Sequence, residues 1–541
     1  DIEDIDRVAR KDYLAFINAY DWMNIGGAQL SILDVGCGSG TIPGLLGPST
    51  EASRAFARSI GTYDLLDISA NSLRIAAERI PFHVGSKYHT SIQTFEHSEH
   101  FAEAAARGYD LVWSIHGITA VAPEHLDASL LSMLRCTKLG GRTVVVISDH
   151  DSHYARIDRA YHADRAAQGI VSRPCFLTAE DVVATLERRG VPCSVVTMTT
   201  SYVFPTTDVA SFRNFNAWCV YDLDFDIERC GPAAASYIAS CRDPSHEGYR
   251  LHLSSKAITI QRNALSVLRW LAFDSQIPAL AGEDYARCAT AFEAQSTQRS
   301  EITRALVDSG VYAALAAHAA LELRVLSVGC GDGVQDLAML RAALPGTFAG
   351  VVRYTGIDPN SAQRARCQET MAGATIESAA LQAAILSPES VAAEARFEGI
   401  HLLHVLYYVP DLRETIRWAA ERLTPGGRLL VWHAPNEEMN QLARVFWDGQ
   451  RPEPIPFADD VEAALRAEGL TYARHRVDGF LRLSATPGSA EHEDVLSFLI
   501  QADSMRLGNE LRRELAATIG HLAGSEGKLA HPVCFFIAER A

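Results

Sequence analysis

The residues best placed to do chemistry occur twice, as a glycine-rich turn followed by an aspartate. The turns contain Gly36, Gly38 and Gly40 before Asp67, and Gly329, Gly331 and Gly333 before Asp358. Glycine permits positive φ angles and lets a ligand approach the backbone closely. A carboxylate at the end of the next strand can accept hydrogen bonds from both ribose hydroxyls. The glycine spacing is tighter than in the dinucleotide fingerprint, so the pattern favours an adenosyl ligand.

One histidine stands at the same place in each copy, His116 in Tyr109-Asp-Leu-Val-Trp-Ser-Ile-His116 and His404 in Glu398-Gly-Ile-His-Leu-Leu-His404. Each is expected at the carboxyl end of a strand, beside the crevice where open α/β sheets bind ligands. Histidine titrates near neutral pH and can serve as a base or as a neutral hydrogen-bond partner. The alternative is a satisfied core residue, which this position makes the weaker interpretation.

The elements that position these residues also recur. Four blocks match in order at a nearly constant spacing, from the first glycine turn to the Gly-Gly turns at Gly140 and Gly426. Such a repeat indicates a tandem duplication. In each copy short β-branched runs alternate with helical patterns, which predicts a mostly parallel, doubly wound sheet. Strands are expected at 31–35, 62–67, 111–115 and 143–147, then 324–328, 354–357, 400–405 and 428–432; helices are expected at 69–79, 127–137 and 411–423.

The fold class is therefore α/β, with two tandem Rossmann-like domains, each carrying a C-terminal extension of helices and strands. The extensions end in the strand-like runs 257–261 and 533–537. A helical period covers 263–281, with Pro278 near its end and Gly282 directly after it. This change of pattern places the junction near there and predicts domains at 1–275 and 276–541.

The turns resemble motif I of class I S-adenosylmethionine-dependent methyltransferases. The second copy is similar to the histamine N-methyltransferase family and its amine-methylating relatives. The residues that carry this likeness are Arg324-Val-Leu-Ser-Val-Gly-Cys-Gly-Asp-Gly333, Gly356-Ile-Asp-Pro-Asn-Ser361 and His401-Leu-Leu-His-Val-Leu-Tyr-Tyr-Val-Pro-Asp411. Gly527-Lys528 before the final apolar strand also fits. The resemblance covers nearly all of the second copy and mainly the sheet of the first.

The resemblance implies S-adenosyl-L-methionine as cofactor, with S-adenosyl-L-homocysteine as product. The glycines of both turns would pass under its methionine and ribose, and Asp67 and Asp358 would hold the ribose. The chain departs from the family where His116 and His404 replace a glutamine that faces the amine. The paired tyrosines of the family are Tyr407 and Tyr408 in the second copy, whereas Thr119 and Ala120 stand in the first. Further acceptor contacts are expected from a polar residue before the last strand and from an N-terminal acid, at His252, His531 and Asp21.

The amino-acid composition limits the kinds of partner that the protein is expected to bind. The 541 residues include 49 basic and 66 acidic side chains, a net charge of −17, which argues against a nucleic-acid binder. The longest apolar stretch is interrupted by charges, so no membrane partner is expected. The 11 scattered cysteines and the absence of a basic leader favour a reduced, cytoplasmic protein. Asp149-His-Asp-Ser-His153 has permissive metal-ligand types, but a solvated loop is favoured and no metal is predicted.

The expected function is methyl transfer to a small amine- or imidazole-bearing metabolite, in biosynthesis, with two successive methylations if both copies are active. In one alternative a single copy is catalytic and the other is a degenerate scaffold, and in another the acceptor is the oxygen of a small natural product. Two hypotheses from other functional classes are a cofactor sensor without turnover and a dinucleotide-dependent dehydrogenase. The copies would form a pseudo-dimer within one chain, and a homo-oligomer remains open.

Overall fold

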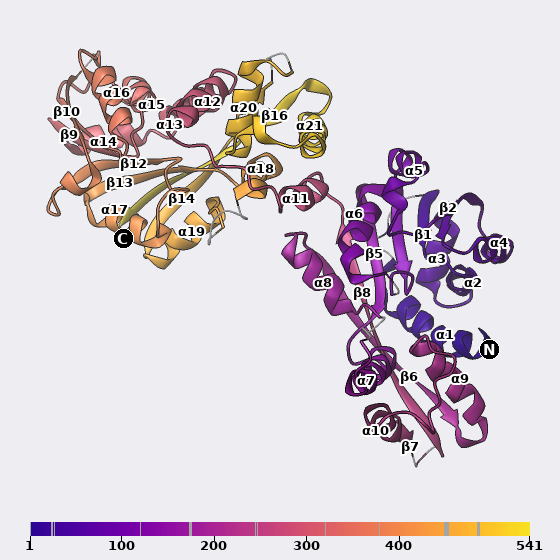
Figure 1. The fold of residues 1–541 in the computed structure, drawn as a ribbon. Helices are drawn as coiled ribbons and strands as arrows, with labels where there is room; N and C mark the ends of the chain where they lie inside the picture. The colour runs from indigo at the N-terminus through magenta and orange to yellow at the C-terminus, as the bar shows by residue number, and fades with distance from the viewer. Residues whose placement is uncertain are drawn as a thin grey trace. The chain divides into compact units, whose positions relative to one another are not determined.

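The computed structural model describes residues 2–22, 25, 28–119, 121–171, 176–243, 245, 247–319, 321–377, 379–447, 454–483 and 487–540, without the side chains of 2–6 and 438. The chain divides into two compact units, Asp1–Trp270 and Leu271–Ala541, called unit 1 and unit 2 below. Each unit is built around one sheet (Figure 1).

The sheet of unit 1 has the order β3-β2-β1-β4-β5-β8-β6, with the short strand β7 paired to β8. Strands β1 to β5 are parallel, while β8 runs antiparallel to β5, β6 and β7. Their bounds are β1 Leu30–Val35, β2 Ile60–Asp67, β3 Val84–His89, β4 Tyr109–Ile115, β5 Thr137–Ser148, β6 Ser194–Pro205, β7 Arg242–Asp243 and β8 Gly248–Gln261.

Helices cover both faces of this sheet. One face packs against residues of α1 to α4, such as Phe16, Leu45, Phe56 and Leu73, and α6 and α8 contact β4 and β5. The helices are α1 Ile2–Ala19, α2 Thr41–Leu46, α3 Glu51–Ser59, α4 Ala70–Arg79, α5 Phe101–Arg107, α6 Leu126–Cys136, α7 His153–Ala167, α8 Ala179–Arg188, α9 Val209–Cys219, α10 Pro232–Ser240 and α11 Ser266–Ala272.

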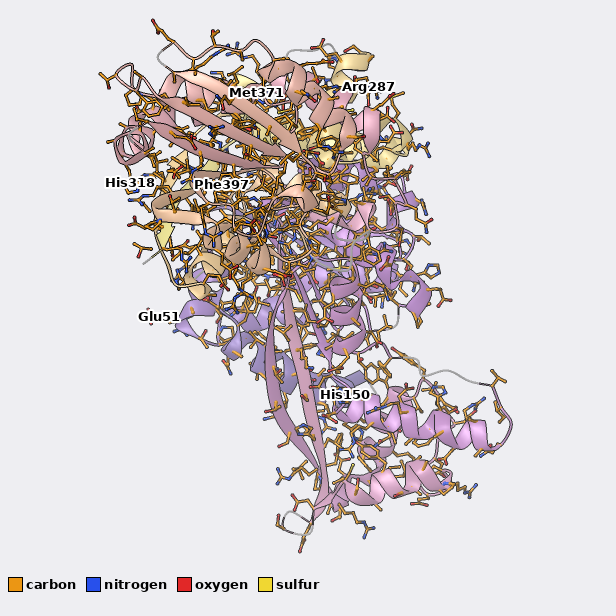
Figure 2. The ribbon with its side chains drawn as sticks, turned by 90° about the vertical axis from the view of Figure 1, so that its left-hand side faces the viewer. Glu51, His150, Arg287, His318, Met371 and Phe397 are labelled. Carbon is orange, nitrogen blue, oxygen red and sulfur yellow. The ribbon has the colours of Figure 1, made fainter. Side chains whose placement is uncertain are left out.

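Strands β6 and β8 extend far past the rest of the sheet of unit 1 and carry an additional small core (Figures 1 and 2). Phe204 on β6 and Leu253 on β8 pack there against Phe212 and Phe215 of α9 and Ile157 of α7. These side chains are fully or almost fully buried. The extension therefore has its own hydrophobic support.

The sheet of unit 2 has the order β11-β10-β9-β12-β13-β17-β14, which repeats the order of unit 1 position by position. Only β17 is antiparallel to its neighbours β13 and β14. The strands are β9 Glu322–Val328, β10 Val351–Ile357, β11 Ala380–Leu386, β12 Phe397–Leu403, β13 Leu423–His433, β14 Leu470–Val477 and β17 Val533–Arg540; a separate pair is formed by β15 Phe480–Arg482 and β16 Lys528–Ala530.

The helices of unit 2 also lie on both faces of its sheet. Residues of α13 to α16 pack on one face and residues of α17 and α19 on the other. The bounds are α12 Gly282–Ala294, α13 Gln298–Asp308, α14 Val311–Ala319, α15 Val334–Ala343, α16 Ser361–Met371, α17 Leu412–Glu421, α18 Glu438–Trp447, α19 Ala458–Ala467, α20 Ala490–Ile500 and α21 Asn509–Ala523.

The predicted fold class, mostly parallel doubly wound sheets, is confirmed. The expected strand 400–405 ends earlier, because β12 stops at Leu403 and His404 already has a positive φ. The helical period of 263–281 gives only α11, and α12 begins at Gly282. Periodicity overestimated that helix, since apolar spacing does not reveal where a chain turns away.

No helix among the described residues is long and apolar enough to cross a membrane. The cysteines in that part of the chain are free thiols.

Candidate functional site

In each unit the glycine turn that follows the first strand is hydrogen-bonded to an aspartate at the carboxyl end of the second strand. In unit 1 the Gly38 N–H donates to Asp67 Oδ2 at 2.9 Å, and in unit 2 the Gly331 N–H donates to Asp358 Oδ2 at 3.2 Å. The other carboxylate oxygen of Asp358 accepts the Asn360 N–H at 2.8 Å. Both aspartates are thus fixed by backbone donors, and each oxygen keeps lone-pair capacity for a ligand hydroxyl.

The three glycines of each turn serve different purposes. All six have φ between 51° and 77°, where a side chain would be strained. A Cβ on Gly329 would lie 2.5 Å from Val405, and one on Gly333 would lie 2.6 Å from Cys367 Sγ. A Cβ on Gly331 would meet nothing within 4 Å, and the same holds for Gly38. The outer glycines permit packing, and the middle glycine faces open space where a ligand fits.

His116 and His404 occupy the same position and the same unusual backbone conformation. Each follows the fourth strand of its sheet, with φ of 56° at His116 and 50° at His404. The His116 N–H donates to Val146 O at 2.8 Å, and the His404 N–H donates to Trp432 O at 3.1 Å. Left-handed φ is uncommon for residues other than glycine and clusters at functional sites. The backbone of the neighbouring strand therefore holds both rings at the carboxyl edge of the sheet.

In unit 2 the ring of His404 is held by two side chains. Gln298 Nε2 donates to His531 O at 3.2 Å, which turns Gln298 Oε1 toward His404 Nε2 at 2.9 Å. The amide oxygen only accepts, so His404 carries its proton on Nε2. His404 Nδ1 then accepts from the Tyr407 hydroxyl at 3.2 Å, and that hydroxyl accepts the Ala434 N–H at 2.8 Å. The tautomer is fixed by this chain of bonds.

Burial keeps the histidines of this region uncharged. Burial lowers the pKa of His404 to about 3, and the nearby His433 and Arg299 act in the same direction. Burial also lowers the pKa of His531 to about 3 and that of His433 to about 4. At neutral pH these imidazoles are therefore hydrogen-bonding groups without charge.

The predicted residues of unit 2 meet at one cavity of about 650 Å³. Its lining includes Gly329, Gly331, Asp358, His404, Tyr407, Tyr408 and His531, whereas Gly333 does not line it. Ligand clefts typically enclose roughly 300–1,000 Å³. The turn, the acid and the acceptor-side residues of unit 2 thus share one space of suitable size.

In unit 1 the partner of the histidine is an acid on α1. His116 Nε2 lies 3.9 Å from Asp12 Oδ2, and neither buried atom has a hydrogen-bond partner. Burial raises the pKa of Asp12 to about 7, to which the charge of Asp149 adds, and burial lowers the pKa of His116 to about 4. The acid was expected at Asp21, which is exposed just after α1. Asp12 lies on the buried face of α1, and an acidic residue on the inner face of a helix is the sequence signal that could have identified it.

The remaining expected residues of unit 1 are not gathered in the same way. His252 is exposed on β8, opposite Ser201. His252 lies inside β8, whereas His531 lies two residues before β17 begins at Val533, so the two histidines are not at matching strand positions. Thr119 is buried and its hydroxyl lacks a partner, and Ala120 lies outside the described residues.

The Asp149–His153 loop has structural partners. Asp149 Oδ1 accepts the backbone N–H groups of Asp151 and Ser152 at 3.0 and 3.1 Å. His153 Nδ1 lies 2.9 Å from the Tyr237 hydroxyl, and His153 Nε2 lies 3.1 Å from Asn216 Oδ1. Within the described parts of the chain no group of three or more His, Cys, Asp or Glu residues is placed to hold a metal ion.

A buried polar network lies behind each turn. In unit 2, Asp336 of α15 accepts from Tyr354 at 2.7 Å and from His401 Nδ1 at 2.8 Å, and His401 Nε2 accepts from Tyr312 at 2.6 Å. In unit 1 Asp34, on β1, accepts from Tyr63 at 2.7 Å. Trp113 stands on β4 where His401 stands on β12. The same strand position therefore carries an apolar ring in one unit and a polar ring in the other.

Residues 279–474 match the family described as a methyltransferase domain. A curated relative, the 27-O-demethylrifamycin SV methyltransferase of Amycolatopsis mediterranei (strain S699), is 28% identical over 152 residues. That alignment covers 27% of this chain and 53% of the relative, so the chain spans about half the length of the curated relative that it matches.

Solved structures with a similar chain path include a putative methyltransferase of Bacillus halodurans C-125, 13% identical, covering 45% of this chain and 97% of that one at a TM-score of 0.30. Another is the N-methyltransferase NodS of Bradyrhizobium japonicum WM9 in complex with S-adenosyl-L-homocysteine, 14% identical, covering 48% and 100% at a TM-score of 0.28.

The sheets of this chain have the α/β methyltransferase fold. The family match supports S-adenosylmethionine as the cofactor. The residues present fit this cofactor, because Gly331 has open space where a Cβ would stand and its N–H donates to the carboxylate of Asp358. Gln298 was not expected from the sequence, since an amide near a helix start carries no motif of its own.

Proposed function

We propose that unit 2 transfers a methyl group from S-adenosylmethionine to a small-molecule acceptor. The observation that carries this proposal is the shared cavity, which brings Gly331 and Asp358 together with His404 and Tyr407. When bound, the cofactor supplies an electrophilic methyl group on a sulfonium. The residues of the chain contribute by binding and orienting both molecules and by excluding water.

Each group has a distinct task in this proposal. Asp358 would accept the ribose hydroxyls, and the bare face of Gly331 would admit the cofactor against the backbone. The His404–Gln298 pair would orient the acceptor, because its tautomer is fixed and it is uncharged. Tyr407 holds that ring on its far side.

The nature of the acceptor atom is a separate part of the proposal. The family resemblance favours an amine or an imidazole, whereas the curated relative is named for methylation of an oxygen. A small-molecule acceptor suits the cavity size in both cases. A cytoplasmic, biosynthetic role remains a prediction from the sequence.

We propose that unit 1 binds the same cofactor through Gly38 and Asp67, whose geometry matches that of unit 2. Its acceptor side differs, since Asp12 faces His116 where Gln298 faces His404. Two active units would permit two methylations, and a single active unit would leave unit 1 as a cofactor-binding scaffold.

Calorimetry with S-adenosyl-L-homocysteine and the full chain tests both points. A stoichiometry near two supports cofactor sites in both units, and a value near one that Asp358→Ala abolishes assigns the single site to unit 2. Transfer of a radiolabelled methyl group to an acceptor panel tests catalysis. Absence of nucleoside binding overturns the proposal, as does binding whose affinity is unchanged by Asp67→Ala combined with Asp358→Ala.

A further inference from the structure

The cavity of unit 2 is bordered by a continuous strip of aromatic rings. Tyr408 contacts Trp447, with ring centroids 6.0 Å apart, and Tyr285, at 6.4 Å. Tyr285 contacts Phe498 at 5.5 Å, and Phe498 contacts Phe292 at 4.7 Å. These residues come from α12, α18, α20 and the segment after β12, and all of them line the cavity. Four separate segments therefore contribute one apolar wall.

The polar atoms of this wall largely satisfy one another. The hydroxyls of Tyr285 and Tyr408 are 3.0 Å apart, within hydrogen-bond distance. At the far end of the strip the ring of Phe292 lies against His531, with centroids 5.1 Å apart. His531 is neutral at pH 7 because burial lowers its pKa to about 3. The strip itself therefore presents rings and hydroxyls, while Glu293 and Arg299, which act electrostatically on Tyr285, form an ion pair with each other.

The carboxylates among the described lining residues are already engaged. Glu293 forms an ion pair with Arg299, and Asp336 accepts from Tyr354 and His401. Asp358 accepts from two backbone donors, and Asp332 accepts the Val334 N–H. A desolvated ammonium group needs a carboxylate partner or must lose its proton. None of these carboxylates forms a hydrogen bond with His404, whose ring nitrogens are engaged by Gln298 and Tyr407.

We infer that the acceptor of unit 2 is an uncharged aromatic hydroxyl compound, seated on the strip from Trp447 to Phe292, and not a cationic amine. The inference rests on the proposed function and specifies its substrate class. A flat aromatic molecule gains ring stacking and apolar burial on this wall. Its hydroxyl is neutral at pH 7, so binding requires no prior deprotonation. On transfer the hydroxyl oxygen would bond to the methyl carbon as the methyl–sulfur bond breaks, leaving neutral S-adenosyl-L-homocysteine, and the hydroxyl proton would pass to the uncharged imidazole of His531, which lines the cavity. An alkylamine with a pKa near 10 would be neutral in only about one molecule in a thousand at pH 7.

The comparison with unit 1 shows what a cation would require. There the side chain that faces the histidine is the carboxyl of Asp12, whereas unit 2 presents the amide of Gln298. Aromatic faces alone attract cations, but more weakly than a carboxylate does in a desolvated site. A carboxylate at residue 298 would therefore be expected to reverse the selectivity.

The test uses two probes of the same ring system, 2-naphthol and 2-naphthylmethylamine, binding to the full chain saturated with S-adenosyl-L-homocysteine at pH 7. Calorimetry is expected to give at least 10-fold tighter binding of 2-naphthol. Trp447→Ala is expected to weaken 2-naphthol binding at least 5-fold. Trp418→Ala, which removes a ring stacked on Arg422 away from this cavity, is the matched control and is expected to leave binding unchanged.

The Gln298→Glu variant supplies the reciprocal measurement, with 2-naphthylmethylamine expected to bind at least 10-fold tighter than to the parent chain. Equal or tighter binding of the amine to the parent chain overturns the inference, as does failure of 2-naphthol to bind. Failure of S-adenosyl-L-homocysteine itself to bind overturns the proposed function instead. The two failures are therefore distinguished before any acceptor is added.

Discussion

The two units place a histidine at the same strand end, in the same left-handed conformation, and surround it with different chemistry. In unit 1 the ring faces a buried acid, Asp12, and neither facing atom has a partner. In unit 2 both ring nitrogens of His404 are engaged, one with Gln298 and one with Tyr407. The cofactor turn is nearly identical in both. The two units therefore share the geometry of the turn and differ in the groups that titrate beside it.

The same contrast appears behind the turns. A tyrosine on the second strand, Tyr63 or Tyr354, donates to a buried acid in each unit. The acid comes from β1 in unit 1 and from α15 in unit 2. His401 adds a second donor to Asp336. The tyrosine thus makes an equivalent hydrogen bond in both units, although its acceptor belongs to a different element in each, as buried polar groups require.

The largest expected difference between the units is a pH dependence of the stability of unit 1 that comes from Asp12. The folded pKa of Asp12 is raised from 3.8 to about 7 by burial, so the folded state binds more protons than the unfolded state between these values. The ionisation of Asp12 therefore costs stability as pH rises from about 4 to about 7, and Asp12→Asn removes this contribution. The lowered pKa of His116 acts in the opposite direction in parent and variant alike, so the comparison between them isolates Asp12. The difference between variant and parent should grow by about 4 kcal/mol over this range, at 1.36 kcal/mol per pKa unit.

Hydrogen exchange of the β1 and β4 amides, compared between parent and variant at each pH, measures this difference. Amides of β9 and β12 in unit 2 serve as the internal control. A difference that does not change with pH would show that Asp12 is ionised normally in the folded unit.

The polar networks predict the next largest effect. Asp336→Ala leaves the buried donors of Tyr354 and His401 without an acceptor, at about 1–3 kcal/mol for each. We expect unit 2 to lose about 3 kcal/mol of unfolding free energy in urea denaturation. Asp34→Ala leaves only the Tyr63 donor and should cost unit 1 less. Equal losses in the two units would contradict a cost that is set by the number of donors left unpaired.

Cofactor binding should separate the units at a smaller energy. Asp358→Ala removes charge-assisted hydrogen bonds worth about 1.5–3 kcal/mol, so S-adenosyl-L-homocysteine should bind unit 2 roughly 10- to 100-fold more weakly. Glu369→Ala, which removes an exposed acid on α16 that does not line the cavity, should have little effect. Calorimetry resolves the change as loss of one class of site. An unchanged isotherm would exclude Asp358 from the binding site.

The smallest expected effect is that the imidazole of His404 does not titrate near neutral pH. Burial lowers the pKa of His404 to about 3, so its imidazole should show no chemical-shift transition between pH 5 and pH 8. Histidine Cε1–H NMR of the full chain checks this, with the resonance assigned by its disappearance in His404→Gln. A midpoint near 6.5 would mean that the ring is solvated and exchanges protons readily.

Much of the fold was accessible from the sequence, because strand runs and glycine turns are local patterns. The strands at 31–35 and 324–328 lie within β1 and β9. The placement of Gly331, Asp358 and His404 at one cavity follows from the rule that parallel strands share their carboxyl edge. These predictions needed only the order of the elements.

The partners of the histidines were harder to predict. Gln298 and Asp12 lie about one hundred residues from the rings that they face, on helices whose packing against the sheet no local pattern specifies. The acid was sought at Asp21, after the helix, because the family resemblance supplied an approximate position and not a face. His252 was expected as the polar residue before the last strand of the first copy, but it lies within β8, exposed and paired with Ser201.

The left-handed backbone at His404 has a consequence for substitution experiments. Only glycine, and to a lesser degree asparagine and aspartate, adopt this conformation at low cost. Replacement by asparagine or glycine would therefore relax the peptide while deleting the ring, whereas valine or isoleucine would add steric conflict to the same deletion. Libraries built at residues 116 and 404 should be enriched in small flexible residues for reasons of folding alone, and a loss of activity among β-branched members should be read as a backbone effect before it is assigned to chemistry.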